Sequence, residues 1–298
     1  DDWGKLDHRY VYYETSRGCP FRCSYCLSSR DDQRPDLRDL GMVMDELDLL
    51  AGRGPALVKL VDRSFNAPPE RARAIWERLI RKHGRGQTRW HFEVHPRFLG
   101  DDDFRLLADA PAGLFQFELG VQTVHDAGRA LVDRPAGWAR ERDAIHELKR
   151  LGTVPLHLDI LAGLPGEGLA QLGQSFDQAA ALEPEHIQLG VLKGLPGTAL
   201  RERAPSFGMV FQARPPYATL RTDALSSEDL ALAARVAELV EGVGNSGLFA
   251  ERLSRGYARH GGPWAFYLAL DRHCASAGFD LRTRNREKLG FVLDAFLG

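Results

Sequence analysis

Cys19, Cys23 and Cys26 stand within eight consecutive residues and supply three of the chain's four thiols. Their C-x3-C-x2-C spacing gathers three thiolates round one centre. A structural zinc site is closed by four ligands, whereas a cubane iron–sulfur cluster held by three thiolates has one iron free to bind a substrate or cosubstrate. The spacing therefore predicts a four-iron cluster with an open coordination position.

Two other interpretations of these cysteines remain open. They could form a zinc knuckle completed by a histidine, or they could be three buried thiols without a ligand. Neither arrangement needs this spacing, nor the aromatic Tyr25 just before the last cysteine. The fourth cysteine, Cys274, is expected to be a small buried residue, because one extra thiol does not make a disulfide framework.

Apolar runs rich in β-forming residues alternate with helical patterns through the first two thirds of the chain. The expected strands are Tyr10–Tyr13, Ala56–Val61, Trp90–Val94, Leu114–Leu119, Pro155–Leu161 and His186–Leu192. The expected helices are Gly41–Ala51, Glu70–Lys82, Asp102–Ala108, Ala139–Leu151 and Leu169–Ala181. The alternation predicts parallel strands with right-handed crossovers, and hence an α/β fold with a partial (β/α)6 barrel. The cysteine loop follows the first strand, at the catalytic end of such a barrel.

The strand–helix alternation stops after Gly197. Residues near Arg214–Thr222 are interpreted as a linker. An N-cap signature at Ser226 then begins an amphipathic run to Gly242, and a second helical run covers Leu248–Arg259. We therefore expect a barrel over residues 1–213 and a C-terminal helical extension over residues 214–298.

The formal net charge of −2 gives no reason to expect a nucleic-acid partner or an anionic membrane surface. No apolar run approaches the roughly 18 residues that a membrane span needs, and no signal peptide is visible. The cytoplasm is therefore the expected location. The chain begins with Asp1 rather than Met, so a missing N-terminal domain is also expected.

Polar residues follow several of the expected strands, where a barrel would present them to its mouth. A buried carboxylate or amide costs roughly 1–3 kcal/mol if unsatisfied, so each requires a protein partner or a bound ligand. Any one of them could be in an internal salt bridge, but their number beside an open cluster favours a ligand. The residues are Asp62, Asn66, Glu93, His95, Gln122 and Asp159.

The cysteine spacing, together with Gly18, Phe21 and Tyr25, resembles the signature loop of the radical S-adenosylmethionine (SAM) superfamily. The resemblance implies a 4Fe-4S cluster whose open iron chelates the amino and carboxylate groups of SAM. It also implies that the reduced cluster splits the sulfonium to release a 5′-deoxyadenosyl radical. Flavodoxin or ferredoxin would donate the electron.

Four residues resemble the SAM-contacting positions of the branch that includes oxygen-independent coproporphyrinogen oxidase. By this resemblance Arg134 pairs with the SAM carboxylate, because guanidinium geometry matches a carboxylate. Glu93 and Gln122 bind ribose hydroxyls or the amino group, and Asp159 orients the network. Two departures, His95 in place of an acid and Ser28 in place of a fourth cysteine, argue against porphyrinogen decarboxylation.

The Asp62–Asn66 turn, which replaces the Gly-Gly-Glu-like turn of many members, points to a narrower group. With the residues after Tyr25, the run Gln188–Gly194 and the Pro-Pro-Tyr segment ending at Tyr217, it resembles a bacterial family of cobalamin-binding-domain radical SAM proteins. Those proteins carry a helical C-terminal domain of unknown function. The resemblance implies that a cobalamin-binding domain would precede Asp1.

The expected function is SAM cleavage by an iron–sulfur radical enzyme, most simply cobalamin-dependent methyl transfer to a carbon of a small molecule or peptide. Rearrangement or oxidation by the adenosyl radical without cobalamin is an alternative. A non-catalytic haem carrier related to the porphyrinogen branch is another. His95 is a candidate acid–base residue, since it shares a strand face with Glu93, although a structural hydrogen bond would explain it equally well.

Overall fold

The structure is a computed structural model that describes residues 10–29 and 35–298. It contains a six-stranded sheet with the order β1-β4-β5-β6-β7-β8. Strand order follows chain order, and the pairs β1–β4, β4–β5 and β5–β6 are parallel. The strands are β1 (Tyr10–Tyr13), β4 (Leu57–Leu60), β5 (Arg89–Glu93), β6 (Phe115–Gln122), β7 (Leu156–Ala162) and β8 (His186–Val191). This confirms the predicted α/β architecture of the partial barrel type.

The chain divides into two compact units, which are described separately. Unit 1 consists of Asp1–Arg22, Ser28–Gly120 and Gly137–His157. Unit 2 consists of Cys23–Leu27, Val121–Ala136 and Leu158–Gly298. The boundary between them passes through the cysteine loop and through β6 and β7, so the predicted site residues are distributed over both units.

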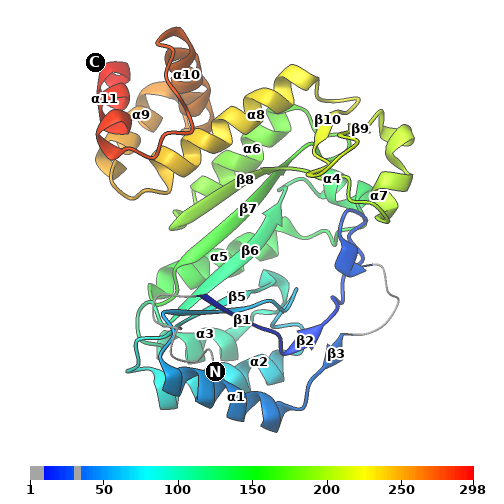
Figure 1. Ribbon diagram of the computed structural model, residues 1–298, viewed down its shortest axis with the longest axis vertical. Helices are drawn as coiled ribbons and strands as arrows, with labels where there is room; N and C mark the ends of the chain where they lie inside the picture. The colour runs from blue at the N-terminus through cyan, green and yellow to red at the C-terminus, as the bar shows by residue number, and fades with distance from the viewer. Residues whose placement is uncertain (1–9, 30–34) are drawn as a thin grey trace. The chain divides into compact units, whose positions relative to one another are not determined.

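Unit 1 packs four helices against one another and against one face of its strands. They are α1 (Leu40–Arg53), α2 (Pro69–His83), α3 (Asp101–Ala108) and α5 (Trp138–Leu151), with the short pair β2 (Ser16–Arg17) and β3 (Asp36–Leu37) (Figure 1). Trp76 of α2 stacks on Phe117 of β6 with ring centroids 5.3 Å apart and meets Phe92 of β5 edge-on. The N-cap Asp39 begins α1 by accepting a hydrogen bond from the Met42 backbone N–H.

The two faces of the unit 1 strands have opposite character, because strand side chains alternate between faces. The face towards the helices is aromatic and aliphatic, and its side chains are almost entirely buried. The other face is polar, and the strand register places Lys59, His91 and Gln116 in one row and Glu93 and Glu118 in the next. Burial of every second residue in β6 follows the same alternation. Unit 1 therefore has one face for its core and a second face suited to polar ligands.

Unit 2 is largely helical. Its helices are α4 (Asp126–Leu131), α6 (Leu169–Ala180), α7 (Ala199–Glu202), α8 (Ser227–Leu239), α9 (Ala250–His260), α10 (Pro263–Ser276) and α11 (Arg286–Leu297). A π-helical turn, Val240–Gly244, continues α8. Figure 1 shows α9, α10 and α11 gathered beyond this turn, and α10 also contacts α6. Ser226 caps α8 through a reciprocal bond pair with Asp229, as the sequence predicted.

Three details differ from the sequence expectations. The segment interpreted as a linker contains β10 (Thr219–Arg221), which pairs antiparallel with β9 (Val210–Phe211). The short helix α4 was not predicted, since six residues are too few to show a helical period. The helix expected from Leu248 begins at Ala250. Cys274 is buried with 1% exposure, as expected.

Candidate functional site

In unit 2, the second half of the cysteine loop is held by backbone hydrogen bonds. The Cys26 N–H donates to the Cys23 carbonyl over 3.0 Å and forms a tight turn. Ser24 donates to the Val132 carbonyl, and its own carbonyl accepts from Leu200, both over 2.9 Å. Cys23 is buried and Cys26 is half-buried, and neither is in a disulfide. The turn thus presents two cysteines on a fixed backbone.

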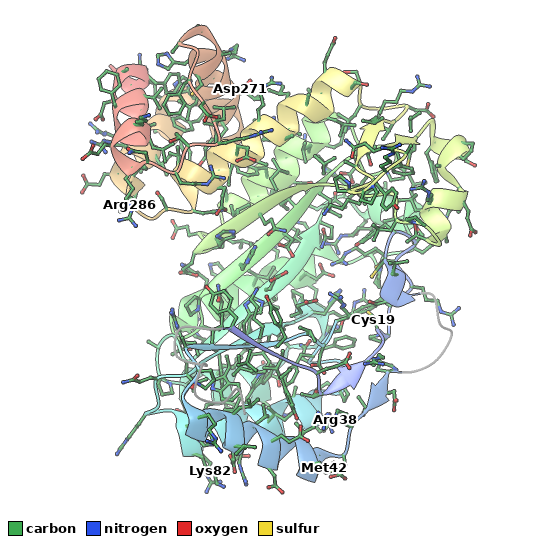
Figure 2. All side chains as sticks on the ribbon, in the orientation of Figure 1. Cys19, Arg38, Met42, Lys82, Asp271 and Arg286 are labelled. Carbon is green, nitrogen blue, oxygen red and sulfur yellow. The ribbon has the colours of Figure 1, made fainter. Side chains whose placement is uncertain are left out.

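In unit 1, Cys19 is also a free, half-buried thiol, and its place in the loop is labelled in Figure 2. It follows Gly18, whose φ of 103° is a conformation that favours glycine. The Cys19 Sγ lies 3.6 Å from the hydroxyl of Ser64, a buried residue in the turn after β4. Hydrogen bonds to cluster sulfurs tune reduction potential, so Ser64 is a neighbour of functional interest that the sequence did not single out.

Arg134 and Tyr25 lie close to Cys23 within unit 2. The Arg134 guanidinium is buried, and its Nη1 lies 4.0 Å from the Cys23 Sγ. Burial raises the pKa of the Tyr25 hydroxyl, while the positive charge of Arg134 acts in the opposite direction. Tyr25 also packs against an apolar cluster that includes Val132 and Leu200. The structure thus brings together a cysteine, an arginine and a tyrosine that the sequence assigned to one site.

Gln122, the last residue of β6, has two unusual properties. Its φ of 66° lies in the left-handed region, where a residue with a side chain is strained. Its side-chain Oε1 is buried and has no hydrogen-bond partner among residues 10–29 and 35–298. Strained backbone that persists in a fold tends to occur at ligand sites, and a buried amide oxygen without a donor is costly. Both observations fit a residue that binds a ligand donor.

Arg129, in α4, explains how the chain holds Gln122. Its guanidinium is fully buried and donates to the carbonyls on both sides of Gln122, those of Thr123 at 2.9 Å and Val121 at 3.4 Å. It also reaches the Pro135 carbonyl, and its own carbonyl accepts the Arg134 N–H over 3.0 Å. Arg129 is thus a positioning residue for both Gln122 and Arg134. The sequence offered no signal for this role, because the six-residue helix α4 is too short to show a buried side.

A second polar group stabilises the residue after Gln122. The Thr123 hydroxyl donates to the buried Glu167 carboxylate over 2.6 Å, and desolvation raises the pKa of Glu167. A Cβ on Gly128 would lie within the Glu167 side chain, so glycine is required there. This carboxylate, in the Gly-Leu-Pro-Gly-Glu turn, therefore supports the backbone near the end of β6.

The predicted turn after β4 is saturated by protein contacts. Buried Asp62 accepts three hydrogen bonds: from the Thr15 N–H at 3.0 Å, from the Thr15 hydroxyl at 2.6 Å and from the Ser16 hydroxyl at 2.5 Å. The Asn66 amide donates to the His95 carbonyl at 3.1 Å and accepts from the His95 N–H at 2.9 Å. These two side chains hold the loop backbones, and their own hydrogen-bonding atoms are engaged by the protein.

His95 is held in a structural arrangement. Its Nδ1 accepts the Arg97 N–H over 3.3 Å and caps a 3-10 turn, Pro96–Phe98. Its ring lies against Phe21 of the cysteine loop, with centroids 4.3 Å apart. The structural interpretation of His95 that the sequence left open is therefore favoured by its contacts.

Glu93 and Asp159 occupy polar strand positions in different units. Glu93 is half-buried, and one of its oxygens lies 3.5 Å from Arg63. Asp159 is half-buried on β7 between the buried Leu158 and Ile160, so it points to the face opposite those two residues. Both lie on the polar side of their strands.

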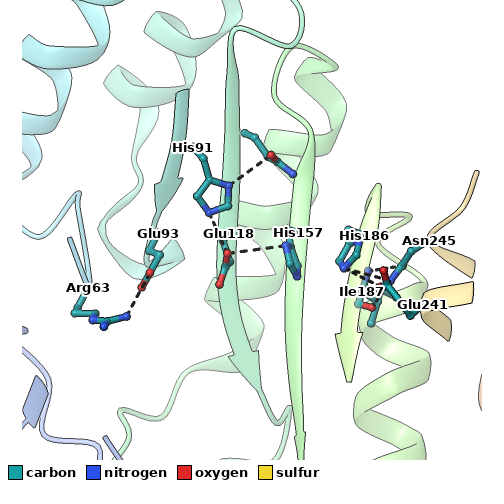
Figure 3. A network of polar contacts seen from close by, with 10 residues as sticks. Arg63, His91, Glu93, Glu118, His157, His186, Ile187, Glu241 and Asn245 are labelled. Atoms are coloured by element: carbon teal, nitrogen blue, oxygen red, sulfur yellow. Dashed lines mark hydrogen bonds and ion pairs between the residues drawn. The ribbon is translucent and has the colours of Figure 1, made fainter. Parts of the chain in front are cut away.

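A row of polar side chains crosses the polar face of the unit 1 strands (Figure 3). Glu118 accepts from His91 at 3.0 Å and lies 3.9 Å from the Nδ1 of His157. The hydrogen bond from His91, with the nearby charges of His157 and Lys59, lowers the pKa of Glu118. Glu118 therefore remains ionised at neutral pH and fixes the orientation of His91.

Within the described part of the chain, no three His, Cys, Asp or Glu side chains converge as a single bound metal ion would require. A cubane cluster does not need that convergence, since each cysteine binds its own iron. Three other observations agree with a bound cluster and SAM. Cys19, Cys23 and Cys26 are in no disulfide, Arg134 lies beside Cys23, and the Gln122 Oε1 has no partner among the described residues.

Comparison with known proteins identifies the family. Residues 13–179 match the Radical SAM superfamily, and they make up more than half of the chain. The chain belongs to the radical SAM superfamily. Membership implies a 4Fe-4S cluster and SAM, in agreement with the cysteine spacing. Residues 205–297 match a second family, described as a protein of unknown function (DUF4080), in the helical part of this radical SAM chain.

Curated relatives match about half of this radical SAM chain. The tRNA-2-methylthio-N(6)-dimethylallyladenosine synthase of Sulfurihydrogenibium sp. (strain YO3AOP1) is 27% identical over 168 residues, which cover 54% of this chain and 38% of that protein. The ribosomal protein uS12 methylthiotransferase RimO of Syntrophotalea carbinolica is 25% identical over 170 residues, which cover 55% of this chain and 37% of that protein. The chain thus spans less than two fifths of these relatives.

Solved structures share the fold. The radical SAM methyltransferase TsrM from Kitasatospora setae superposes with a TM-score of 0.59 at 20% identity, over 70% of this chain and 41% of that one. The cobalamin-dependent radical enzyme OxsB gives a TM-score of 0.60 at 13% identity, over 100% of this chain and 51% of that one. Both confirm the partial barrel, and the second match extends through the C-terminal helices. None of the helices in the described residues is long and apolar enough to cross a membrane.

Proposed function

We propose that Cys19, Cys23 and Cys26 bind a 4Fe-4S cluster and that the chain reductively cleaves SAM. The observation that carries the proposal is Arg134, whose guanidinium lies 4.0 Å from the Sγ of Cys23 in a three-cysteine loop of a radical SAM chain. An anion that binds beside this cysteine would meet a buried positive charge. The carboxylate of SAM fits that position, because a guanidinium pairs with a carboxylate through two hydrogen bonds.

We assign the other SAM contacts to the polar residues that the sequence places at the ends of the strands. The Oε1 of Gln122 accepts from a ribose hydroxyl or from the amino group of SAM, which satisfies the oxygen that is otherwise without a partner. Glu93 and Asp159 supply carboxylates on the polar faces of their strands. Tyr25 covers Cys23 and Arg134. Asp62 and Asn66 act indirectly, by holding the turn whose backbone approaches the amino group.

When bound, the reduced cluster supplies the electron that breaks the sulfonium bond of SAM and yields methionine and a 5′-deoxyadenosyl radical. A flavodoxin or ferredoxin donates that electron in turn. The protein's part is to bind and orient SAM through Arg134 and Gln122. Arg129 assists by fixing the backbone at both positions.

For the overall reaction, we propose methyl transfer to a carbon of a small molecule or peptide with the help of cobalamin. The fold likeness to TsrM and OxsB supports this part. We further propose that residues 1–213 form the catalytic barrel and that residues 214–298 form a helical domain. The second family match, which begins at residue 205, supports that division.

A second candidate is formation of a carbon–sulfur bond, which the names of the methylthiotransferase relatives favour. Both candidates start from the same bound cluster and SAM. They differ in whether a methyl or a methylthio group reaches the product, so a product analysis separates them once a substrate is known.

The first test is anaerobic reconstitution with iron and sulfide, then reduction in the presence of SAM, with and without added cobalamin. Mass spectrometry of 5′-deoxyadenosine and methionine reports radical cleavage. S-adenosylhomocysteine that appears only with cobalamin supports methyl transfer. A cluster that leaves SAM intact while the protein takes up haem would instead support the carrier alternative, and zinc without iron would support the structural site.

The SAM assignment is tested with Arg134→Ala. We expect SAM affinity to fall at least tenfold, which corresponds to the loss of a charge-assisted hydrogen bond, while iron and sulfide content stays the same. Arg142→Ala removes an exposed arginine and is the matched control. Unchanged SAM affinity in Arg134→Ala would remove Arg134 from the site.

A further inference from the structure

Unit 2 contains a cavity of about 520 Å³ that belongs to none of the predicted site residues. It lies between the end of α6, the start of β8, the π-helical turn, α9 and the first turn of α10. Figure 1 shows these elements gathered in the helical part of unit 2. The volume falls within the range of small-molecule sites, roughly 300–1,000 Å³.

The cavity wall is built from fixed elements. Asn245 donates to the Ile187 carbonyl and accepts the Ile187 N–H, each over 3.0 Å, and so pairs with β8 as a neighbouring strand would (Figure 3). The π-helical turn brings Gly244 close to Tyr267, where a Cβ would lie 2.6 Å from the hydroxyl. Single π-helical turns occur often at functional sites. The cavity is therefore preformed by particular contacts.

The charged groups that line the cavity are all acidic. They are Asp177, Glu183 and Glu185, and no Lys, Arg or His of the described residues lines it. Asp177 is the half-buried member, and its Oδ1 accepts the Trp264 N–H at 2.7 Å. Within residues 10–29 and 35–298, no side-chain cation pairs with Asp177, and desolvation raises its pKa. The charged side chains of the cavity wall are thus carboxylates, and a bound cation would favour the ionised form of Asp177.

Asp271, labelled in Figure 2, shows how the same unit treats a buried carboxylate with a structural role. Arg235 binds both of its oxygens, at 2.9 and 3.0 Å. Burying a carboxylate without a partner is unfavourable, and a structural carboxylate is normally paired. Asp177 differs from Asp271 in this respect: within the described residues it accepts the Trp264 N–H, and as a half-buried residue of the cavity wall it can also take a ligand cation.

Three aromatic residues, Phe176, Tyr257 and Tyr267, line the cavity together with Asp177. The ring centroids of Phe176 and Tyr267 are 5.8 Å apart, those of Tyr257 and Tyr267 are 6.0 Å apart, and the two tyrosine hydroxyls are 3.0 Å apart. Aromatic faces attract organic cations, while the aliphatic Leu253 and Ile187 suit an apolar body. The charge and the apolar lining of the cavity thus both favour an organic cation with an apolar body.

We propose that this cavity binds a small organic ammonium ion that carries an apolar body, with Asp177 as its counter-ion. The site is separate from the proposed cluster and SAM residues, and it does not depend on the proposed reaction. It gives the helical region of unknown function a ligand-binding role.

The test uses 2-phenylethylammonium as the probe and 2-phenylethanol as its neutral counterpart, added to the full chain at millimolar concentrations. Binding is followed through the NMR resonances of Ile187 and Asn245. We expect the ammonium probe to shift these resonances with saturation and the alcohol to bind about tenfold more weakly. Asp177→Asn keeps an oxygen for the Trp264 N–H and removes the charge, so it should abolish that preference.

Two further variants keep the result interpretable. Ser254→Phe places a ring in the cavity from an exposed position on α9 and should exclude both probes without unfolding the chain. Glu251→Gln removes an exposed carboxylate of α9 that does not line the cavity and should leave binding unchanged. The proposal is wrong if the ammonium probe shifts none of the cavity resonances, or if Asp177→Asn binds it as tightly as the unaltered chain.

Discussion

Two regions that the sequence assigned to SAM differ in how the protein satisfies their polar atoms. In the turn after β4, Asp62 accepts three hydrogen bonds and Asn66 is engaged at both ends of its amide. At the end of β6, Gln122 is held in a left-handed conformation with an unpaired buried oxygen. The Asp62 and Asn66 side chains stabilise the fold, whereas Gln122 keeps a buried acceptor without a donor among the described residues.

The difference shows that resemblance to a family locates a site without telling which side chains touch the ligand. A residue whose hydrogen-bonding capacity is filled can only position its neighbours. A strained residue with an empty acceptor gains energy when a donor arrives. Substitutions in the first region should therefore act mainly on stability, and those in the second mainly on affinity.

The largest effect is expected from the cysteines. Cys19→Ala, Cys23→Ala and Cys26→Ala should each abolish the cluster, whereas Cys274→Ala should leave it intact. Burial raises the pKa of Cys274 to about 11, so it is a protonated thiol at neutral pH and no ligand. Iron and sulfide analysis with visible absorbance measures the outcome. Equal loss in all four variants would mean that the ligand set is wrong.

Asp62→Ala should destabilise the fold by about 2 kcal/mol, because it leaves the buried Thr15 N–H without an acceptor. Chemical denaturation measures the free energy of unfolding, and Asp45→Ala on the exposed side of α1 is the control. SAM affinity of the folded fraction should change little. A stable variant with strongly reduced SAM affinity would place Asp62 in direct contact with SAM.

Gln122→Gly should show the opposite pattern. Glycine relieves the left-handed φ at an entropic cost of about 1 kcal/mol, so the free energy of unfolding should stay level or rise slightly. SAM affinity should fall about tenfold with the loss of the acceptor. Glu183→Gly relieves a similar φ of 51° at another position and should leave SAM affinity unchanged. Equal SAM binding by both glycine variants would exclude Gln122 from the site.

Much of the fold and of the candidate site could be predicted from the sequence, because the signals that decide them are local. The cysteine spacing and the alternation of Leu158, Asp159 and Ile160 each lie within a few residues, so they can be recognised without knowledge of the fold. The role of Arg129 depends on carbonyls six and eight positions away, and that of Asp62 on Thr15, forty-seven positions away. The pairing of polar side chains is a long-range property, so the sequence could place Asp62 and Gln122 in one site without separating their roles.

The smallest effect should come from Glu118, another carboxylate with its partner in place. The pKa of Glu118 is lowered in the folded state, chiefly by the His91 hydrogen bond. Its ionisation therefore stabilises the fold at pH values above its unfolded-state pKa. That stabilisation is lost as the pH falls through the lowered folded-state pKa. Glu118→Gln should therefore cost about 1 kcal/mol at neutral pH and progressively less in acid. Unfolding free energies of both proteins measured from neutral pH into the acid range test this. A cost that does not change with pH would mean that Glu118 acts through packing alone, and a loss of SAM affinity would move it from the satisfied group to the ligand-binding group.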